Sequence, residues 1–268
     1  DIINETLIIN NDDLKSFAYH RKENNFAFEK REYAEQILRY LIEDFNTENI
    51  GDIFKKEAII IAANSGARVS EIRNFEYGSC FYSEEEGLYK IILEYTDKVN
   101  QQNRPIYLTK DGYNAIKRLE ELKKEHDILK LSFNDRTKRS YIHLFHYRGI
   151  DAINETSMDQ FLNRIKKEIV LIDKNGKVIK GGMHGFRHFF GMTVFVESDY
   201  NISVLRYLLG HRNYNMSYQY LEEEKDEVLN IIRNKDSYNK FSGRGLDTLV
   251  DALLNDNKNN GLESILEK

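Results

Sequence analysis

The 268-residue sequence contains one cysteine, one proline and no tryptophan. A single cysteine, Cys80, cannot form a disulfide within the chain and supplies too few thiolates for a cysteine-based zinc site. The sequence also has no run of about 18 apolar residues and shows no charged-then-apolar pattern, so we expect neither a membrane-spanning helix nor a secretory signal in it. These absences are typical of an intracellular protein, and we expect a cytoplasmic location with no membrane contact.

No stretch rich in glycine, serine and proline divides the chain, and 41% of its residues are apolar, enough for a substantial core. We predict one domain over residues 1–235 and a C-terminal helical tail over 236–268, because the sequence becomes polar after Asn234. The tail keeps two short amphipathic segments, 246–254 and 262–266. Their apolar residues favour docking on this chain or on a neighbouring copy.

The net charge of −5 argues against a simple nucleic-acid binder, but the charge is unevenly distributed. Residues 98–148 carry 12 Lys and Arg against 6 Asp and Glu, and residues 164–187 carry 7 against 2. Both ends of the chain, 1–60 and 221–268, are acidic. The basic middle could present one positive face to a polyanion, or the charges could simply solvate helix surfaces.

Hydrophobic periodicity and turn residues predict a mainly helical chain with strands in its middle. Helices are predicted at 14–22, 31–45, 53–63, 110–125, 158–170 and 216–234, with two more beginning near 184 and 202. Strands are predicted at 79–82, 88–95, 104–108 and 142–147, and a small hairpin at 171–180. The predicted fold class is α+β, mainly helical, with a small antiparallel sheet or hairpin on one edge.

Candidate functional side chains gather between His184 and Tyr220, where HGFRH is followed by LLGH and YQY. His184 and Arg187 are three residues apart at a predicted helix start and can project from one face. Gly210 ends an apolar run, so His211 follows a helix C-terminus. A guanidinium matches phosphate bidentately, an imidazole can donate or relay a proton, and a phenol can act as a nucleophile. The set favours a phosphate-like anion, although a histidine on a helix face is also a common structural residue.

Two further cations lie outside this stretch. Arg68 follows Gly66, which ends a predicted helix, and precedes another short helix, where backbone amides favour an anion. The alternative is a surface arginine paired with Glu71. Lys98 lies in a polar connection between two predicted strands, where a mobile lysine could protonate a leaving oxygen, although most hairpin lysines are only solvated.

In chain order the candidates resemble the active-site set of the tyrosine site-specific recombinases, the phage-integrase and Xer-like enzymes. The resemblance rests on SGARVSEI around Arg68, the hairpin lysine, HGFRH, LLGH and a tyrosine nine residues after the last histidine, and it covers residues 50–225. It implies the tyrosine recombinase catalytic fold, with no cofactor and no metal. It also implies double-stranded DNA with specific recombination sites as the partner, and self-association as a tetramer on DNA. The catalytic set is Arg68, Lys98, His184, Arg187, His211 and Tyr220.

The resemblance also assigns roles to these residues. The two arginines clamp the non-bridging oxygens of a scissile DNA phosphate, and the two histidines donate hydrogen bonds or assist proton transfer. Tyr220 attacks the phosphorus to form a 3′-phosphotyrosyl link, and Lys98 protonates the departing 5′-hydroxyl. Tyr218 is a competing nucleophile, but two residues of separation on a helix correspond to a rotation of roughly 200°, so only one of them can reach the phosphate. The nine-residue spacing selects Tyr220.

The chain departs from the family pattern in two places. The connection from Lys98 to Arg104 is one residue longer than the common form and lacks the usual glycine after the lysine. Fewer than 70 residues precede the Arg68 block, too few for the usual helical DNA-clamping domain as well as the first catalytic helices. We therefore expect the catalytic part of a longer recombinase, or a short member without the clamp.

Three alternatives remain open. A type IB topoisomerase-like nicking and closing enzyme shares the chemistry, but that branch usually has lysine where this chain has His184. A DNA-binding accessory protein with an inactive site is a second alternative. A zinc site is the third, because His184 and His188 have the i, i+4 spacing of a metalloprotease helix, but Gly185 stands where such a helix has glutamate.

Overall fold

The computed structural model describes residues 28, 30–96, 101–134, 138–147, 150–173, 175–198 and 202–211. Its helices are α2 (Arg31–Glu43), α3 (Ile50–Ala63), α4 (Val69–Ile72), α5 (Lys110–Glu125), α6 (Glu155–Glu168), α7 (Met183–Glu197) and α8 (Ile202–Leu209). Its strands are β1 (Phe81–Ser83), β2 (Leu88–Thr96), β3 (Gln101–Leu108), β4 (Leu131–Asn134), β5 (Arg139–Ile142), β6 (His146–Tyr147) and β7 (Ile150–Asp151). The mainly helical α+β class predicted from the sequence is confirmed.

Side-chain caps set where three of the predicted helices begin. Asn49, Thr109 and Asn154 each accept a hydrogen bond from the backbone N–H three residues further along the chain, at the starts of α3, α5 and α6. Such a cap satisfies one of the amide donors that a helix start leaves without a partner. The caps explain why α3 and α6 each begin three residues before the ranges that periodicity predicted.

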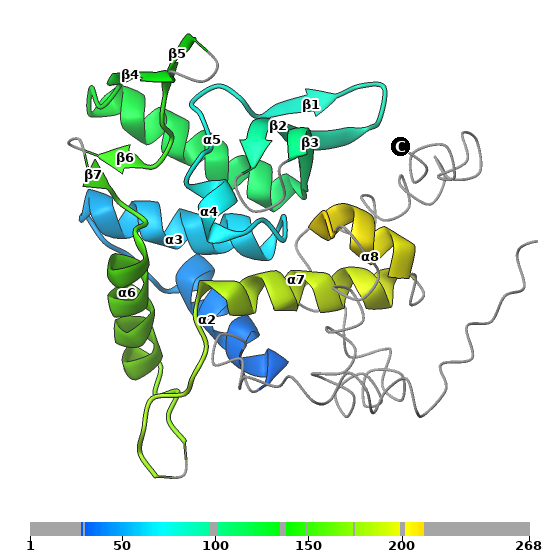
Figure 1. Cartoon of the computed structure of the whole chain (residues 1–268). Helices are drawn as coiled ribbons and strands as arrows, with labels where there is room; N and C mark the ends of the chain where they lie inside the picture. Colours follow the sequence, from blue (N-terminus) through cyan, green and yellow to red (C-terminus); the bar gives the residue numbers. More distant parts are fainter. Residues whose placement is uncertain are drawn as a thin grey trace, which may run out of the picture.

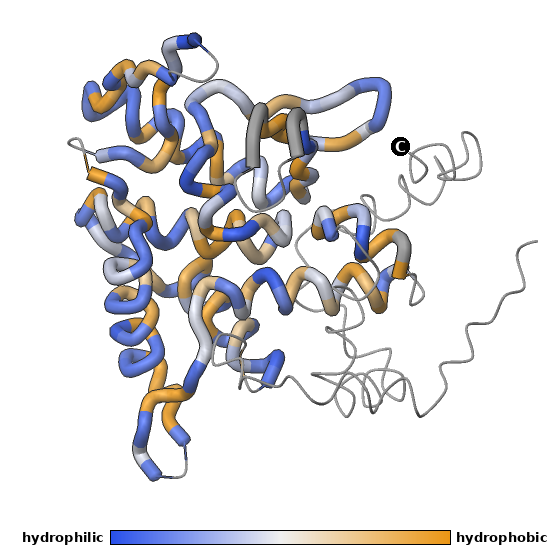
Figure 2. The backbone as a smooth tube through the Cα atoms, viewed as in Figure 1, coloured by the Kyte–Doolittle hydropathy of each residue, from blue (hydrophilic) through white to orange (hydrophobic). Residues whose placement is uncertain are grey.

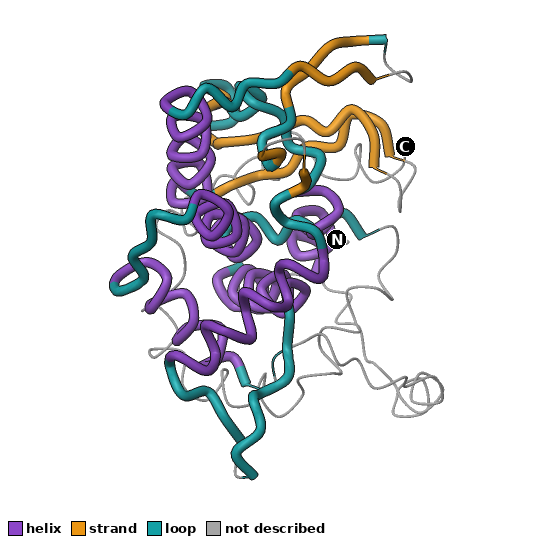
Figure 3. Tube along the Cα trace, turned by 90° about the vertical axis from the view of Figure 1, so that its left-hand side faces the viewer, coloured by secondary structure: helices purple, strands orange, loops and turns teal. Residues whose placement is uncertain are grey.

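The main sheet is antiparallel in the order β1-β2-β3, and it lies at one edge of the helical body (Figure 3). In the β2–β3 pair, Leu93 lies opposite Arg104 and Thr96 lies opposite Gln101. The strand positions predicted in this region are confirmed, with β2 and β3 longer than expected. The two strands flank the segment 97–100, to which Lys98 belongs.

One local prediction was wrong. The expected strand at 142–147 is divided between β5 and β6, because each is the partner in a separate two-stranded sheet, β5 with β4 and β6 with β7. The small hairpin predicted at 171–180 is confirmed, with an antiparallel bridge between Ile172 and Val178 and a turn at Gly176. The predicted helices at 14–22 and 216–234, the tail segments and the boundary at 235 lie outside the described residues.

The core is built around α3, which contacts α5 on one side and α7 on the other, while α2 lies against α7 (Figure 1). Its consecutive residues Ile59, Ile60 and Ile61 are all buried. A helix that is apolar on every side is stable only when other elements surround it. Outer helices such as α6 show hydrophilic and hydrophobic residues in alternating bands instead, the pattern of a helix with one solvated face (Figure 2). No helix among the described residues is long and apolar enough to cross a membrane.

A second apolar cluster fixes α8 against the end of α7 and the main sheet. It includes Phe190 and Val194 of α7, Leu205 and Leu209 of α8, and Tyr107 of β3. The hydroxyl groups of Tyr107 and Tyr207 are 3.0 Å apart and join β3 to α8. This cluster brings the C-terminal end of α8 beside the turn that follows α3.

That turn depends on Gly66, whose φ is +61°. A Cβ at this position would lie 2.5 Å from the ring of Phe190 and 2.7 Å from a methyl group of Leu209. Both the backbone angle and the available space therefore require glycine. The close approach places the residues after Gly66 directly beside α7 and the end of α8.

Candidate active site

Arg68 lies at the N-terminus of α4, two residues beyond Gly66. Its backbone N–H donates to Glu71 Oε2 at 2.7 Å, and its guanidinium donates to Glu71 Oε1 at 3.0 Å. The Arg68 side chain remains 14% exposed. The pairing with Glu71 considered in the sequence analysis is therefore present, but it belongs to a partly buried cluster and not to an open surface.

Arg187 of α7 is almost fully buried. Its guanidinium donates to the carbonyl oxygens of Gly66 and of Leu209, the latter at 2.7 Å. Its Nη1 also lies 3.9 Å from Glu71 Oε2. Arg187 therefore joins the turn after α3 and the end of α8 to α7, and places its positive charge beside that of Arg68.

Glu71 and Arg104 complete the cluster, and both are 4% exposed. Arg104 projects from β3, and its guanidinium forms an ion pair with Glu71 Oε1. Burial lowers the pKa of Arg104 to about 10, with Glu71 opposing the shift and Arg187 and Arg68 adding to it. Arg104 is therefore still protonated at neutral pH, and three guanidiniums around one carboxylate leave an excess of two positive charges.

His211 lies at the edge of the same cluster. Gly210, at φ +60°, ends α8, and the backbone N–H of His211 donates to the carbonyl of Arg206 at 3.0 Å. Burial, followed by the charges of Arg187, Arg68 and Arg104, lowers the pKa of His211 to about 3. Its imidazole is therefore neutral at physiological pH, so one ring nitrogen can donate a hydrogen bond while the other accepts.

His184 and His188 lie one turn apart on α7, with ring centroids 4.7 Å apart in an edge-to-face arrangement. His184 is exposed at the helix start, whereas Arg187 and His188 are buried. Burial lowers the pKa of His188 to about 3, with smaller contributions from His184 and Arg187. Within the part of the chain that the structure describes, no group of three or more His, Cys, Asp or Glu could hold a metal ion.

The two buried histidines predict a loss of stability in acid. Their folded pKa values lie below the ordinary value of 6.5, so the unfolded chain takes up protons that the folded chain does not. Their stabilising contribution is therefore complete above pH 6.5 and is lost as the pH falls below it. We expect the free energy of unfolding in urea to be lower at pH 5.5 than at pH 7.5 by about 1 kcal/mol for each histidine.

A variant pair tests this assignment. His188→Gln should remove its share of the pH dependence, whereas His126→Gln, at an exposed position beyond α5, should leave the dependence unchanged. Equal unfolding free energies for the wild-type protein at the two pH values would contradict the prediction.

The structure therefore brings together Arg68, Arg187 and His211, and it places His184 at the start of α7. Lys98 and Tyr220 lie outside the described residues, so their assignments stay predictions. Arg104 was not identified from the sequence as a member of the cluster, although the alternation of buried residues along β3 indicates it. Arg104 is in phase with the buried residues Ile106 and Leu108 of β3, and a charged residue on the core side of a strand needs a buried partner.

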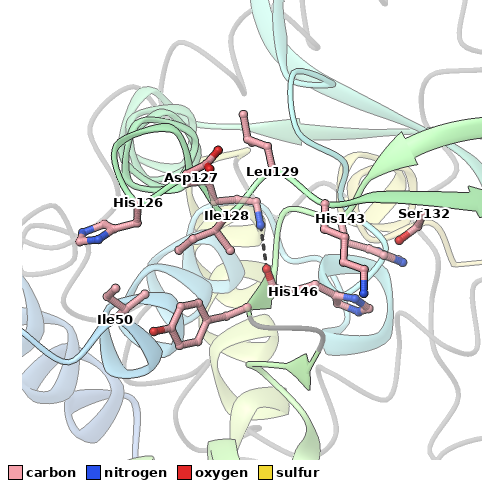
Figure 4. Close-up of a pocket in the computed structure, with 11 residues that line it drawn as sticks. Ile50, His126, Asp127, Ile128, Leu129, Ser132, His143 and His146 are labelled. Atoms are coloured by element: carbon pink, nitrogen blue, oxygen red, sulfur yellow. Dashed lines mark hydrogen bonds between the residues drawn. The ribbon is translucent and has the colours of Figure 1, made fainter.

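A separate hollow of about 610 Å³ lies at the other end of α5, and no residue of the arginine cluster lines it (Figure 4). Lys123 lines it and donates to the carbonyl oxygen of His146 at 2.7 Å. Burial lowers the pKa of Lys123 to about 8 and that of His143 to about 4. The nearly parallel rings of His143 and His146, with centroids 3.8 Å apart, also line the hollow. Arg68, Arg187 and His211, which the sequence analysis identified, lie in the arginine cluster. The candidate active site is therefore that cluster and not this hollow.

Comparison with solved structures shows where this fold occurs. The integrase of the Tn1549 transposon, in complex with circular intermediate DNA, is 18% identical with a TM-score of 0.52, and the match covers 76% of this chain and 67% of that chain. The XerH site-specific recombinase, bound to a palindromic difH substrate, is 20% identical with a TM-score of 0.54, and the match covers 75% of this chain and 51% of that chain. The match to XerH thus spans about half of that recombinase's length. No curated protein matches the chain significantly.

The sequence itself matches the phage integrase family over residues 31–227, most of its length. This range includes the turn after α3, the main sheet, α7 and α8, and it extends beyond Tyr220. The chain therefore belongs to the phage integrase family, the tyrosine recombinases.

Proposed function

We propose that this chain catalyses site-specific recombination for a mobile element, and that its substrate is double-stranded DNA carrying specific recombination sites. The observation that carries the proposal is that Arg68 and Arg187, from separate elements, share the buried carboxylate of Glu71, with His211 close enough for their charges to lower its pKa. The excess positive charge of this cluster suits a DNA phosphate. The DNA-bound Tn1549 integrase and XerH, which share the fold, support DNA as the substrate.

In the proposed reaction, Arg68 and Arg187 bind the non-bridging oxygens of the scissile phosphate. As the tyrosine attacks, negative charge accumulates on these oxygens, and fixed guanidiniums in a partly buried site stabilise it more than water does. His211 and His184 donate hydrogen bonds to the same oxygens or assist proton transfer. The neutral state of His211 fits this role because a neutral imidazole can give or receive a proton with little reorganisation.

The covalent step conserves the bond energy of the DNA backbone. The phenol oxygen of Tyr220 forms a bond to phosphorus as the bond to the 5′-oxygen breaks. The phenol passes its proton to a neutral histidine of the site, His211 or His184, and Lys98 gives a proton to the departing 5′-oxygen. A new 5′-hydroxyl then attacks the 3′-phosphotyrosyl link and releases the tyrosine. Neither ATP nor a metal ion is required, because the arginines and the lysine supply the charge and the proton.

A plasmid assay tests the proposed function against the topoisomerase alternative. Two supercoiled plasmids are compared in EDTA, one carrying the junction sequences of the element that encodes the chain and one without them. We expect a covalent protein–DNA adduct and recombined products only with the junction plasmid. Relaxation of both plasmids at equal rates would favour the type IB topoisomerase, and absence of any adduct would favour an inactive accessory protein.

Self-association is a further part of the proposal. We propose that four copies assemble on two DNA sites in the cytoplasm, with segment 246–254 or 262–266 of the tail docking on the neighbouring copy. Both segments combine apolar residues with an acidic surrounding sequence. Truncation after Asn239 should abolish the slow-migrating synaptic complex on a native gel while single-site binding persists. A truncated protein that still forms this complex would contradict the assignment of the tail.

A further inference from the structure

Arg104 is the third guanidinium of the arginine cluster, and the proposed reaction assigns it no contact with DNA. Its side chain is 4% exposed, on the core side of β3 between the sheet and the end of α8. Arg68, by contrast, keeps 14% of its side chain accessible. The Arg104 guanidinium contacts two neighbours in the cluster, and these contacts show which parts of the site it can affect.

The first neighbour is Glu71. Arg104 and Arg68 both donate to the same carboxylate atom, Oε1, while Arg187 approaches the other oxygen at 3.9 Å. A carboxylate shared among several guanidiniums holds each of them less tightly than it would hold one alone. Arg104 therefore fixes the orientation of Glu71 and also limits how strongly Glu71 neutralises Arg68.

The second neighbour is the turn that carries His211. Arg104 donates to the carbonyl oxygen of Leu208 at 3.4 Å, in the last turn of α8. A Cβ added at Gly210 would lie 2.4 to 2.7 Å from the guanidinium of Arg104. The guanidinium thus fills the space beside Gly210, and the next residue along the chain is His211.

From these contacts we infer that Arg104 is a positioning residue for strand cleavage, which orients Arg68 through Glu71 and holds the turn that presents His211. The inference rests on the proposed function, because Arg68 and His211 are the groups that Arg104 sets in place. It predicts that loss of Arg104 impairs the chemical step more than DNA binding. Loss of a residue with a structural role alone would lower the measured cleavage and the measured DNA binding together, each in proportion to the fraction of folded protein.

The test measures cleavage and binding separately. Single-turnover cleavage of a nicked, site-bearing duplex is followed at saturating protein, and DNA affinity is measured by gel shift in a Tyr220→Phe background. Arg104→Met should slow cleavage by about 10- to 100-fold, the range for a displaced catalytic group, with DNA affinity changed by less than about 3-fold. Arg104→Lys, which keeps the charge but lacks the planar fork, should recover part of the rate.

A matched control is Arg118→Met. Arg118 of α5 pairs with the buried Glu57 through two hydrogen bonds of 2.7 and 3.1 Å, but it lies outside the arginine cluster. This variant should lose stability without a change in the cleavage rate of the folded protein. Thermal unfolding of every variant gives the folded fraction at the assay temperature.

Several outcomes would overturn the inference. Arg104→Met cleaving at the wild-type rate would do so, as would a loss that equals the loss of folded protein. If Arg104→Met does not fold, Arg104→Lys decides, because a folded lysine variant with the wild-type rate would exclude any need for the guanidinium geometry. A wild-type protein that forms no adduct would overturn the proposed function and this inference with it, whereas the other outcomes concern Arg104 alone.

Discussion

Replacing Tyr220 with phenylalanine is expected to abolish covalent attachment of the protein to DNA, whereas Tyr218→Phe is expected to preserve it. The phenol oxygen forms the bond to phosphorus, and phenylalanine has no atom that can replace it. Removal of a nucleophile typically costs several orders of magnitude in rate, so the adduct of Tyr220→Phe should fall by at least about 1,000-fold. The two tyrosines are a matched pair, two residues apart in the same sequence segment.

The measurement uses a duplex with a nick close to the cleavage site. After cleavage the short fragment with the 5′-hydroxyl is released, religation is prevented, and the adduct appears as a slow band on a denaturing gel. Both variants should bind the uncleaved duplex with similar affinity, which shows that each is folded. An adduct with Tyr220→Phe but not with Tyr218→Phe would show that the nine-residue spacing selected the wrong residue.

The second large effect is expected at Arg68. Arg68→Gln removes the more accessible guanidinium of the cluster, and the loss of one preorganised donor to a developing anion typically lowers a rate by about 100- to 1,000-fold. Arg68→Lys should fall between this variant and the wild-type protein, because an ammonium keeps the charge but cannot form the bidentate fork. The partial exposure of Arg68 means that its loss leaves the core intact.

Arg73 is the control for this prediction. It lies just after α4, its side chain is 46% exposed, and it pairs with Asp151 and not with Glu71. Arg73→Gln should cleave the suicide substrate within a few-fold of wild type, since surface pairs of this kind contribute little. Equal losses in Arg68→Gln and Arg73→Gln would mean that general positive charge, and not a positioned guanidinium, supports cleavage.

Most helices could be predicted because their signals are local. The apolar run at 53–63, the capping residues before α3 and α5, and Gly210 at the end of α8 all act within a few residues. The β4–β7 region could not be predicted in the same way. Its two-residue strands β6 and β7 exist only through pairing with each other, and a segment of two residues has no periodicity to detect.

The residues of the candidate site could be predicted from local signals, but their burial could not. Arg68, His184, Arg187 and His211 could be identified from the sequence because each belongs to a short motif with a glycine nearby. The sequence did not show that Arg187 would be buried while His184, three residues away, stays exposed. Arg187 is buried because the turn after α3 and the end of α8 lie against it and accept its hydrogen bonds.

The sequence by itself determined the family to which the chain belongs and supplied the candidate catalytic residues, because residue type and spacing are local properties. Only the tertiary structure decided that Arg104 joins Arg68 and Arg187 around Glu71. The reason is physical: a buried carboxylate is stable only where cations converge on it, and these cations come from a helix start, a strand and a central helix that meet through packing between distant segments.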